Sequence, residues 1–339
     1  MWHFKGTLAI LALAVEMLTA SACGSTLDPE PGTGYVARWM SSLDDEIPLT
    51  ALSIPGAHDA ATASVTAWTQ WTRTQDLDIA TLWSYGVRAF DLRPAWVDGT
   101  IGIYHDKYSA HISFPEVLAI LLRELQRQPG EFAVVIIRHE EEADGASPEW
   151  SKAFGQILAA QADHLASYHA GITVGELRGK VLILSRNRYE GGPFGGYIEQ
   201  WYSGKDLDRQ KGASVVNAAG EKSPLWVQDF YDPESGDEKW DVFRTIYEAA
   251  SNGNAGPHPL VINHASGYLG RLPNYRKNAA AVNPKAADLI RRKSAPAGIV
   301  MMDFAGVDTS HGVKVGGRDL IRAIIDCNYC YNGRDDIVG

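Results

Sequence analysis

Cysteine is scarce in this sequence, and basic residues are outnumbered. The 339 residues include 3 cysteines, and 31 Lys and Arg stand against 41 Asp and Glu, for a formal net charge of −10. Three cysteines are too few for a scaffold held together by disulfides. Nucleic-acid binding needs a basic surface, so the acidic balance argues against a nucleic-acid partner. It does not exclude a small anionic substrate, because a few arginines can outweigh the net charge locally.

Long hydrophobic runs are also missing, since none approaches the roughly 20 residues of a membrane-spanning helix. The apolar run Leu8–Leu18 follows Lys5 and precedes the small residues Ala20–Ala22. This order predicts an export signal over residues 1–22. Two alternatives stay open for Cys23, which comes next: it is lipidated as in a bacterial lipoprotein, or the chain is secreted without an anchor. Either way, we expect an exported protein.

Hydrophobic residues make up 45% of the chain, which is enough to fill a large core and excludes a mainly disordered protein. Short β-rich runs alternate with amphipathic helical patterns. The predicted strands are Thr50–Ile54, Val87–Leu92, Thr100–Tyr104, Phe132–Ile137, Lys180–Ser185, Leu225–Gln228, Leu260–Asn263 and Gly298–Met302. The predicted helices are Val117–Leu125, Trp150–Leu165, Asp237–Ser251, Asn283–Arg292 and Arg318–Asp326. Eight strands with intervening helices favour one irregular (β/α)8 barrel of the TIM type over two domains. We assign residues 23–42 to a tether, 43–330 to the barrel and 331–339 to a tail.

Polar side chains follow the predicted strands. In a parallel barrel, reactive groups lie where the strands end, at the carboxyl face. The residues found there are His58, Asp59, Arg93, His105, Arg138, Arg186, Asp229, Tyr231 and Asp303. Two histidines and an arginine can transfer protons in both directions while neutralising a phosphate, and carboxylates beside the histidines fix their tautomers. This set predicts phosphodiester cleavage.

The motifs resemble those of bacterial phosphatidylinositol-specific phospholipases C. The segments Ile47–Asp59 and Gly86–Arg93, with Tyr104 and His105, look like the catalytic X region of that family. The likeness continues, in family order, through Gly179–Arg186, Val227–Tyr231 and Ile299–Asp303. It spans nearly the whole chain after the export signal. The resemblance implies a barrel that cleaves phosphatidylinositol to diacylglycerol and a 1,2-cyclic inositol phosphate.

The resemblance also implies roles for individual residues. His58 matches the general base that takes the proton of the inositol 2-hydroxyl, and Asp303 matches the carboxylate that orients this base. His105 matches the general acid that protonates the departing diacylglycerol oxygen, with Asp59 as its carboxylate partner. Arg93 matches the cation that stabilises charge on the phosphoryl oxygens. The remaining matches are head-group contacts, namely Arg138, Arg186, Asp229 and, stacked on the inositol ring, Tyr231. Bacterial relatives commonly have Lys where Arg138 stands, which changes the hydrogen-bond geometry.

Arg93 also bears on metal dependence. Calcium-dependent relatives place a carboxylate ligand at this position, and calcium needs several oxygen ligands. Because a guanidinium occupies the place of the ion, we predict an enzyme that needs no metal and no cofactor. Two alternatives remain. One is a metal-dependent phosphodiesterase for glycerophosphodiesters or sphingolipids on a related barrel, and the other is an inactive lipid- or inositol-binding module.

Trp68 and Trp71 lie in a polar stretch after the first motif, where relatives carry a short rim helix. Tryptophan suits the membrane interface, so the resemblance implies peripheral contact with membranes that contain phosphatidylinositol. The alternative is a pair of core-facing tryptophans. We expect a monomer.

Cys327 and Cys330 have metal-ligand spacing, but no second cysteine or histidine pair completes a zinc site. In an exported protein this favours a local disulfide between them. We expect His139 and Glu140–Glu142 to be solvated loop residues, and we assign no role to His264.

Overall fold

The computed structural model of the chain describes residues 34–251 and 259–331. The predicted export signal, the predicted lipidation site Cys23 and the predicted tail from residue 332 onward lie outside the described residues. Within these ranges, every helix is too short or too polar to cross a bilayer.

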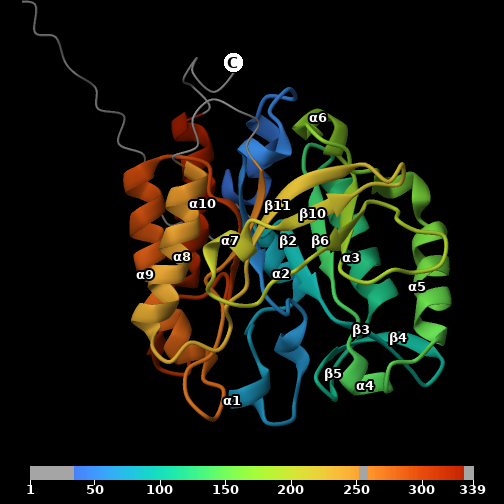
Figure 1. Cartoon of the computed structure of the whole chain (residues 1–339), viewed down its shortest axis with the longest axis horizontal. Helices are drawn as coiled ribbons and strands as arrows, with labels where there is room; N and C mark the ends of the chain where they lie inside the picture. The colour runs from blue at the N-terminus through green and yellow to red at the C-terminus, as the bar shows by residue number, and fades with distance from the viewer. Residues whose placement is uncertain (1–33, 252–258, 332–339) are drawn as a thin grey trace, which may run out of the picture.

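Nine strands close into a barrel at the centre of the described part of the chain (Figure 1). Around the ring their order is β6, β2, β1, β13, β12, β11, β10, β9 and β8, and β8 pairs again with β6. The strands are β1 Ser53–Ala57, β2 Ala89–Leu92, β6 Ala133–Ile137, β8 Val181–Ser185, β9 Gly196–Glu199, β10 Ala213–Val216, β11 Lys222–Gln228, β12 Leu260–His264 and β13 Gly298–Met302. Their pairings are parallel except for β9 with β10 and β10 with β11. A short strand, β7 Leu165–Ala166, pairs with the start of β8.

Helices cover the outside of the barrel. In Figure 1, α8, α9 and α10 lie on one side and α3 and α5 on the opposite side. The longer helices are α2 Ile79–Ser84, α3 Phe114–Arg127, α5 Glu149–Ala159, α8 Gly236–Ser251, α9 Tyr275–Lys293 and α10 Gly317–Tyr331. The helices of a single turn are α1 Thr69–Thr72, α4 Glu141–Asp144, α6 Val174–Leu177 and α7 Leu207–Gln210. The 3-10 helices are η1 Val36–Ser42, η2 Leu49–Ala51, η3 Thr62–Ser64 and η4 Ala162–His164.

Helix α3 illustrates how local sequence produces this outer layer. Ser113 accepts a hydrogen bond from the backbone N–H of Glu116, whose carboxylate in turn accepts the backbone N–H of Ser113 at 2.8 Å. Such a reciprocal cap stabilises a helix by about 1 kcal/mol. The apolar residues Val117, Leu121 and Leu125 recur at four-residue spacing and are buried, so one face of the helix packs on the barrel.

The predicted class, an irregular α/β barrel, is confirmed, but one predicted strand lies outside it. Thr100–Tyr104 is part of β4 Thr100–His105, which pairs with β3 Pro94–Val97 and β5 Tyr108–Ser113 in a separate antiparallel sheet. Only Arg93 separates β2 from β3, so the chain runs straight past the barrel end into this sheet. Together with α1 and α4, the three strands lie at the lower end of the molecule in Figure 1. Two short strands that the sequence analysis missed, β9 and β10, complete the ring.

The folded part also begins before the predicted boundary at residue 43. Trp39 in η1 is fully buried and donates its indole N–H to the carbonyl of Gly86 at 3.0 Å. The buried guanidinium of Arg88 donates to the carbonyl of Ala37 at 2.7 Å and pairs with Glu131 at 3.0 Å. Residues 36–42 therefore belong to the barrel domain and not to the tether.

The predicted disulfide between Cys327 and Cys330 is wrong, because Cys327 is a free thiol. Its side chain points inward from α10 and contacts the carbonyl of Ala295 at 3.3 Å. Burial raises the pKa of this thiol to about 12. Cys327 is therefore a buried packing group and not half of a local bridge.

Candidate active site

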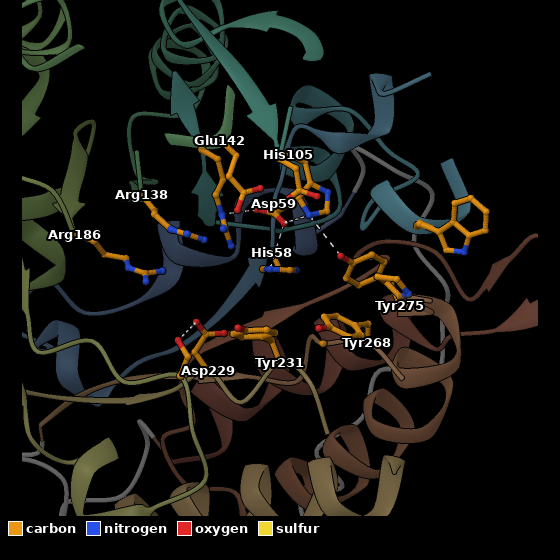
Figure 2. A pocket seen from close by; sticks show the side chains of 16 residues that line it. His58, Asp59, His105, Arg138, Glu142, Arg186, Asp229, Tyr231, Tyr268 and Tyr275 are labelled. Carbon is orange, nitrogen blue, oxygen red and sulfur yellow. Dashed lines mark hydrogen bonds and ion pairs between the residues drawn. The ribbon is translucent and has the colours of Figure 1, made fainter. Parts of the chain in front are cut away.

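The carboxyl ends of the barrel strands surround a pocket of about 410 Å³. The predicted site residues that line it are His58, Asp59, Trp71, Arg93, His105, Arg138, Arg186, Asp229 and Tyr231. Asp303 lies directly behind His58. Figure 2 shows Arg138 and Arg186 on one side of His58, and His105 and Tyr275 on the other. The structure therefore brings together the residues that follow six barrel strands and the last residue of β4, His105.

His58 follows β1 and is oriented by Asp303, which follows β13. The Nδ1 atom of His58 lies 2.9 Å from Oδ1 of Asp303, and the other carboxylate oxygen accepts the backbone N–H of Gly267 at 3.0 Å. Gly267 has a φ of 153°, and a Cβ there would lie 2.9 Å from the carbonyl oxygen of Tyr231, so the position suits glycine. Burial lowers the pKa of His58, but the carboxylates of Asp59 and Asp303 outweigh burial and raise it to about 9.

The turn after His58 is fixed by hydrogen bonds from the side chains of Thr74 and Gln75. The side-chain amide of Gln75 donates to the carbonyl of His58 at 2.8 Å, and the hydroxyl of Thr74 donates to the same carbonyl at 3.0 Å. Asp59 has a φ of 42°, in the left-handed region that non-glycine residues rarely adopt. Backbone strain of this kind persists where neighbours over-determine the geometry, as it does at many functional sites. The result is that His58 and Asp59 both face the pocket.

Asp59 lies between the two histidines. Its Oδ2 atom is 3.4 Å from Nε2 of His58 and 3.6 Å from Nε2 of His105, and its Oδ1 atom is 2.8 Å from Nε of Arg93. Burial raises the pKa of Asp59, but Arg93 and the two histidines outweigh burial and hold that pKa well below its usual range. Asp59 is therefore a carboxylate that lies between two imidazoles and a guanidinium.

His105 reaches the pocket from the end of β4. Its Nδ1 atom lies 2.7 Å from the backbone carbonyl oxygen of Thr72. A carbonyl oxygen only accepts hydrogen bonds, so Nδ1 carries a hydrogen. The other ring nitrogen, Nε2, faces Asp59 and the hydroxyl of Tyr275, which is 3.5 Å away. The protonated form of His105 can therefore release its Nε2 proton into the pocket.

Arg93 is surrounded by three carboxylates. Besides Asp59, its guanidinium lies 3.8 Å from Oδ2 of Asp91 and 3.8 Å from Oε2 of Glu140. Burial lowers the pKa of Arg93, but Asp59 and Asp91 outweigh burial and hold it above its usual range. Arg93 is thus a permanent cation at the base of the pocket.

The sequence analysis expected Glu140 and His139 to be solvated loop residues, and this expectation is wrong for both. Glu140 is 2% exposed, and burial raises the pKa of its carboxyl to about 7. The imidazole of His139 is also buried; it stacks on Trp150 and lies 2.6 Å from Asp144. These contacts attach the segment after β6 to the pocket wall. Three consecutive glutamates are typical of a solvent-exposed loop, so the sequence offers no signal that His139 and Glu140 are buried.

Three side chains at the base of the pocket offer ligand atoms for a cation. Ligand atoms of His58, Asp59 and Asp91 all lie within 4.8 Å of one another. The guanidinium of Arg93 already pairs with both carboxylates of this set. A divalent ion would have to displace or face this fixed positive charge, so the residues present fit a metal poorly.

The side of the pocket opposite His105 is built around Trp201, in the segment after β9. The guanidinium of Arg186 lies over the Trp201 ring, 4.2 Å from its centroid, and the indole N–H of Trp201 donates to Oδ2 of Asp229 at 2.8 Å. Ser203 donates to the same oxygen at 3.1 Å. One aromatic ring therefore fixes both Arg186 and Asp229, and neither Trp201 nor Ser203 was predicted from the sequence. Tyr231 is 43% exposed at the mouth of the pocket.

His264, to which the sequence analysis assigned no role, is buried beside His58. It ends β12, is 3% exposed, and lies with its ring centroid 5.8 Å from that of His58. Its Nδ1 atom hydrogen-bonds with the hydroxyl of Ser266 at 3.0 Å. Burial lowers the pKa of His264 to about 3, so the imidazole packs behind His58 in its neutral form.

Trp71 lies in α1 and Trp68 directly precedes this helix, at the edge of the pocket. Their rings stack with centroids 5.2 Å apart. Trp71 lines the pocket, whereas Trp68 is 60% exposed. Leu272, in the loop before α9, is 63% exposed and shares with Trp71 the lining of a second pocket beside the first. The alternative of a core-facing tryptophan pair is thus wrong for Trp68.

The chain resembles known proteins over most of its length. The chain is 28% identical over 310 residues to a 1-phosphatidylinositol phosphodiesterase of Staphylococcus aureus, covering 86% of this chain and 94% of the relative. A 1-phosphatidylinositol phosphodiesterase of Listeria monocytogenes is 26% identical over 287 residues, covering 79% and 80% of the two chains. No family model matches the sequence.

Solved structures agree with the predicted fold. A variant of the phosphatidylinositol-specific phospholipase C from Staphylococcus aureus superposes with a TM-score of 0.71 at 23% identity, covering 87% of this chain and 98% of that one. The phosphatidylinositol-specific phospholipase C from Listeria monocytogenes superposes with a TM-score of 0.67 at 22% identity, over 86% and 98% of the two chains. The chain is therefore similar in sequence to 1-phosphatidylinositol phosphodiesterases of Staphylococcus aureus and Listeria monocytogenes, and it has the same barrel fold as the solved phosphatidylinositol-specific phospholipases C of these two species.

Proposed function

We propose that this protein is a phosphatidylinositol-specific phospholipase C that needs no metal ion. One observation carries the proposal: the Nε2 atoms of His58 and His105 lie 3.4 and 3.6 Å from the same oxygen of Asp59, beside Arg93. Two imidazoles on one carboxylate can serve as base and acid in a single displacement at phosphorus. The adjacent guanidinium supplies the positive charge that the phosphate requires.

The reaction follows from these positions. His58 takes the proton of the inositol 2-hydroxyl, whose oxygen attacks phosphorus. The bond between phosphorus and the diacylglycerol oxygen breaks, and that oxygen takes the proton from Nε2 of His105. The products are diacylglycerol and a 1,2-cyclic inositol phosphate. Asp303 fixes the tautomer of His58 through the 2.9 Å contact to Nδ1, and Arg93 stabilises charge on the phosphoryl oxygens throughout.

The head group is assigned to the wall opposite His105. Asp229, held by Trp201 and Ser203, is an acceptor for inositol hydroxyls. Arg138 and Arg186 supply donors from the same side of the pocket. Tyr231 offers an exposed ring at the mouth, against which the sugar ring can stack.

A product assay in the presence of chelator tests the proposal. The mature protein with phosphatidylinositol vesicles and excess EDTA is expected to release cyclic inositol phosphate at the rate measured without EDTA, within about 2-fold, because Arg93 takes the place of a metal. The cyclic ester is identified by phosphorus NMR.

The other outcomes separate the alternatives. Loss of activity in EDTA with recovery on adding calcium would show a metal-dependent phosphodiesterase, for which His58, Asp59 and Asp91 offer ligands. Binding of phosphatidylinositol without any product would show an inactive lipid- or inositol-binding module.

Contact with the membrane is proposed for the rim formed by Trp68 and Leu272. Both side chains are more than half exposed at the end of the barrel where the pocket opens, and tryptophan favours the interface between lipid and water. The net charge of −10 disfavours general adhesion to anionic lipids. Apolar insertion should therefore carry the binding. Export of the chain, secreted or anchored through Cys23, remains part of this proposal.

Replacing Trp68 with alanine is expected to weaken binding to phosphatidylinositol-containing vesicles by about 5- to 20-fold, because about 1–2 kcal/mol of apolar burial is lost. Vesicle sedimentation measures the affinity. Trp240→Ala, on the side of the barrel covered by α8, is the matched control and should leave vesicle affinity within 2-fold. Equal affinities for Trp68→Ala and the unaltered protein would refute the assignment of the rim.

A further inference from the structure

The hydroxyl of Tyr275 lies 3.5 Å from Nε2 of His105, within hydrogen-bond distance, and faces the same pocket (Figure 2). Tyr275 is the first residue of α9 and is 6% exposed. Its ring packs at a centroid distance of 6.0 Å against His105 and 6.0 Å against Tyr268. Burial raises the pKa of the phenol well above its usual value, so the hydroxyl keeps its proton. The family resemblance described above implies no role for Tyr275.

The two neighbours of Nε2 differ in what they can do. Asp59 carries only acceptor oxygens, so it stabilises the protonated form of His105 and offers nothing to the neutral ring. A phenol hydroxyl both accepts and donates. It can accept the Nε2–H of the imidazolium before the reaction and donate its own O–H to the bare Nε2 lone pair afterwards.

In the second state, the two groups that contact Nε2 within the described residues are Asp59 at 3.6 Å and the hydroxyl of Tyr275 at 3.5 Å, and of these two the hydroxyl alone can donate. The Nδ1 hydrogen is already directed to the carbonyl of Thr72 at 2.7 Å, so the ring cannot turn without losing that bond. Once Nε2 has given up its proton, the nearby oxygens of Asp59 would face a lone pair. The O–H of Tyr275 resolves this mismatch.

We propose that Tyr275 is a positioning residue for the general acid: it hydrogen-bonds to Nε2 of His105 and stabilises the neutral imidazole that remains when the leaving group has been protonated. The inference rests on the proposed function and deepens it. In the step itself, the bond from phosphorus to the diacylglycerol oxygen breaks and that oxygen takes the Nε2 proton. Tyr275 keeps its own proton and only reverses the direction of its hydrogen bond.

The test compares two leaving groups in the Tyr275→Phe variant, which keeps the ring and its packing. Phosphatidylinositol releases an alkoxide that needs a proton, whereas an inositol phosphodiester of nitrophenol releases a stable phenolate that does not. We expect kcat for phosphatidylinositol to fall about 3- to 10-fold, the contribution of one neutral hydrogen bond. For the nitrophenyl ester it should change by less than 2-fold.

Tyr268→Phe is the matched control, because this ring faces the same pocket and packs on Tyr275. It should leave the ratio of the two rates unchanged. In the His105→Ala background, Tyr275→Phe should have no further effect on phosphatidylinositol, because its partner is gone.

Each contrary result has a distinct meaning. An equal fall for both substrates, no fall for either, or a fall that persists in His105→Ala would overturn the role of Tyr275. If the unaltered protein makes no cyclic inositol phosphate at all, the proposed function itself fails, and the role of Tyr275 fails with it.

Discussion

Replacing His58 with alanine is expected to lower kcat for phosphatidylinositol cleavage by about 10²- to 10⁴-fold, the usual contribution of a positioned general base. Among the described residues, the two carboxylates that approach Nε2 of His58 cannot replace it. Asp59 and Asp91 approach Nε2 of His58 at 3.4 and 4.0 Å, but Asp59 is paired with Arg93, and Asp91 lies near the same guanidinium. Release of cyclic inositol phosphate in single-turnover experiments measures the loss.

The variants His105→Ala and His58→Ala together are expected to lose less than the product of the two single effects, because base and acid act in one displacement. His169→Ala is the control. This imidazole is exposed on the surface and contacts Glu176 and the carbonyl oxygen of Ala170, each at 3.0 Å, so its removal should leave kcat within 2-fold. Full activity in His58→Ala would refute the mechanism.

The parts of the fold that could be predicted from sequence are those with a local signal. The run Val134–Ile137 is apolar throughout, as a strand buried on both faces must be, and β6 is fully buried. The strands β9 and β10 were missed because each has only four residues, too short a run for a hydrophobic period to be recognised. β4 has the alternating burial of a sheet with one exposed face, and the barrel strand β11 begins with the same alternation, so periodicity alone does not distinguish the two.

The site shows the same division. His58, Asp59 and Arg93 could be identified because they directly follow barrel strands in recognisable motifs. Tyr275 could not, since it lies 170 positions from His105 and meets it only in the folded chain. Trp201 likewise follows a strand that was not predicted, and it contacts Arg186 and Asp229 from a different part of the sequence. Strand ends thus identify groups that face the pocket, whereas the residues that hold those groups depend on tertiary contacts.

Replacing Asp303 with asparagine is expected to change both the rate and its pH dependence. The amide cannot stabilise the imidazolium that forms on His58, and it permits the wrong tautomer. A comparable change in a histidine–aspartate pair costs about 10⁴ in kcat, so we expect kcat to fall about 10²- to 10⁴-fold. Asp303 is fully buried and also holds the N–H of Gly267, and melting curves should confirm that the variant folds.

The direction of the pH change follows from the charges around His58. The carboxylates of Asp59 and Asp303 outweigh burial and raise the pKa of His58 to about 9. The base acts only when neutral, so the rate of the unaltered protein should fall as the pH drops below that value. Removing the charge of Asp303 lowers the pKa of His58, so the acid limb of kcat/KM should move to lower pH even as the maximum rate falls.

A fall in the maximum rate together with a move of the acid limb to lower pH distinguishes a carboxylate that orients the base from a merely structural one. A residue needed only for folding would lower the rate at every pH and leave the limb in place. Asp237→Asn, an exposed carboxylate paired with Lys285 at 2.7 Å, should change neither quantity. A limb that stays fixed in Asp303→Asn would mean that the group titrating in the profile is not His58, because 2.9 Å separates that imidazole from the charge removed.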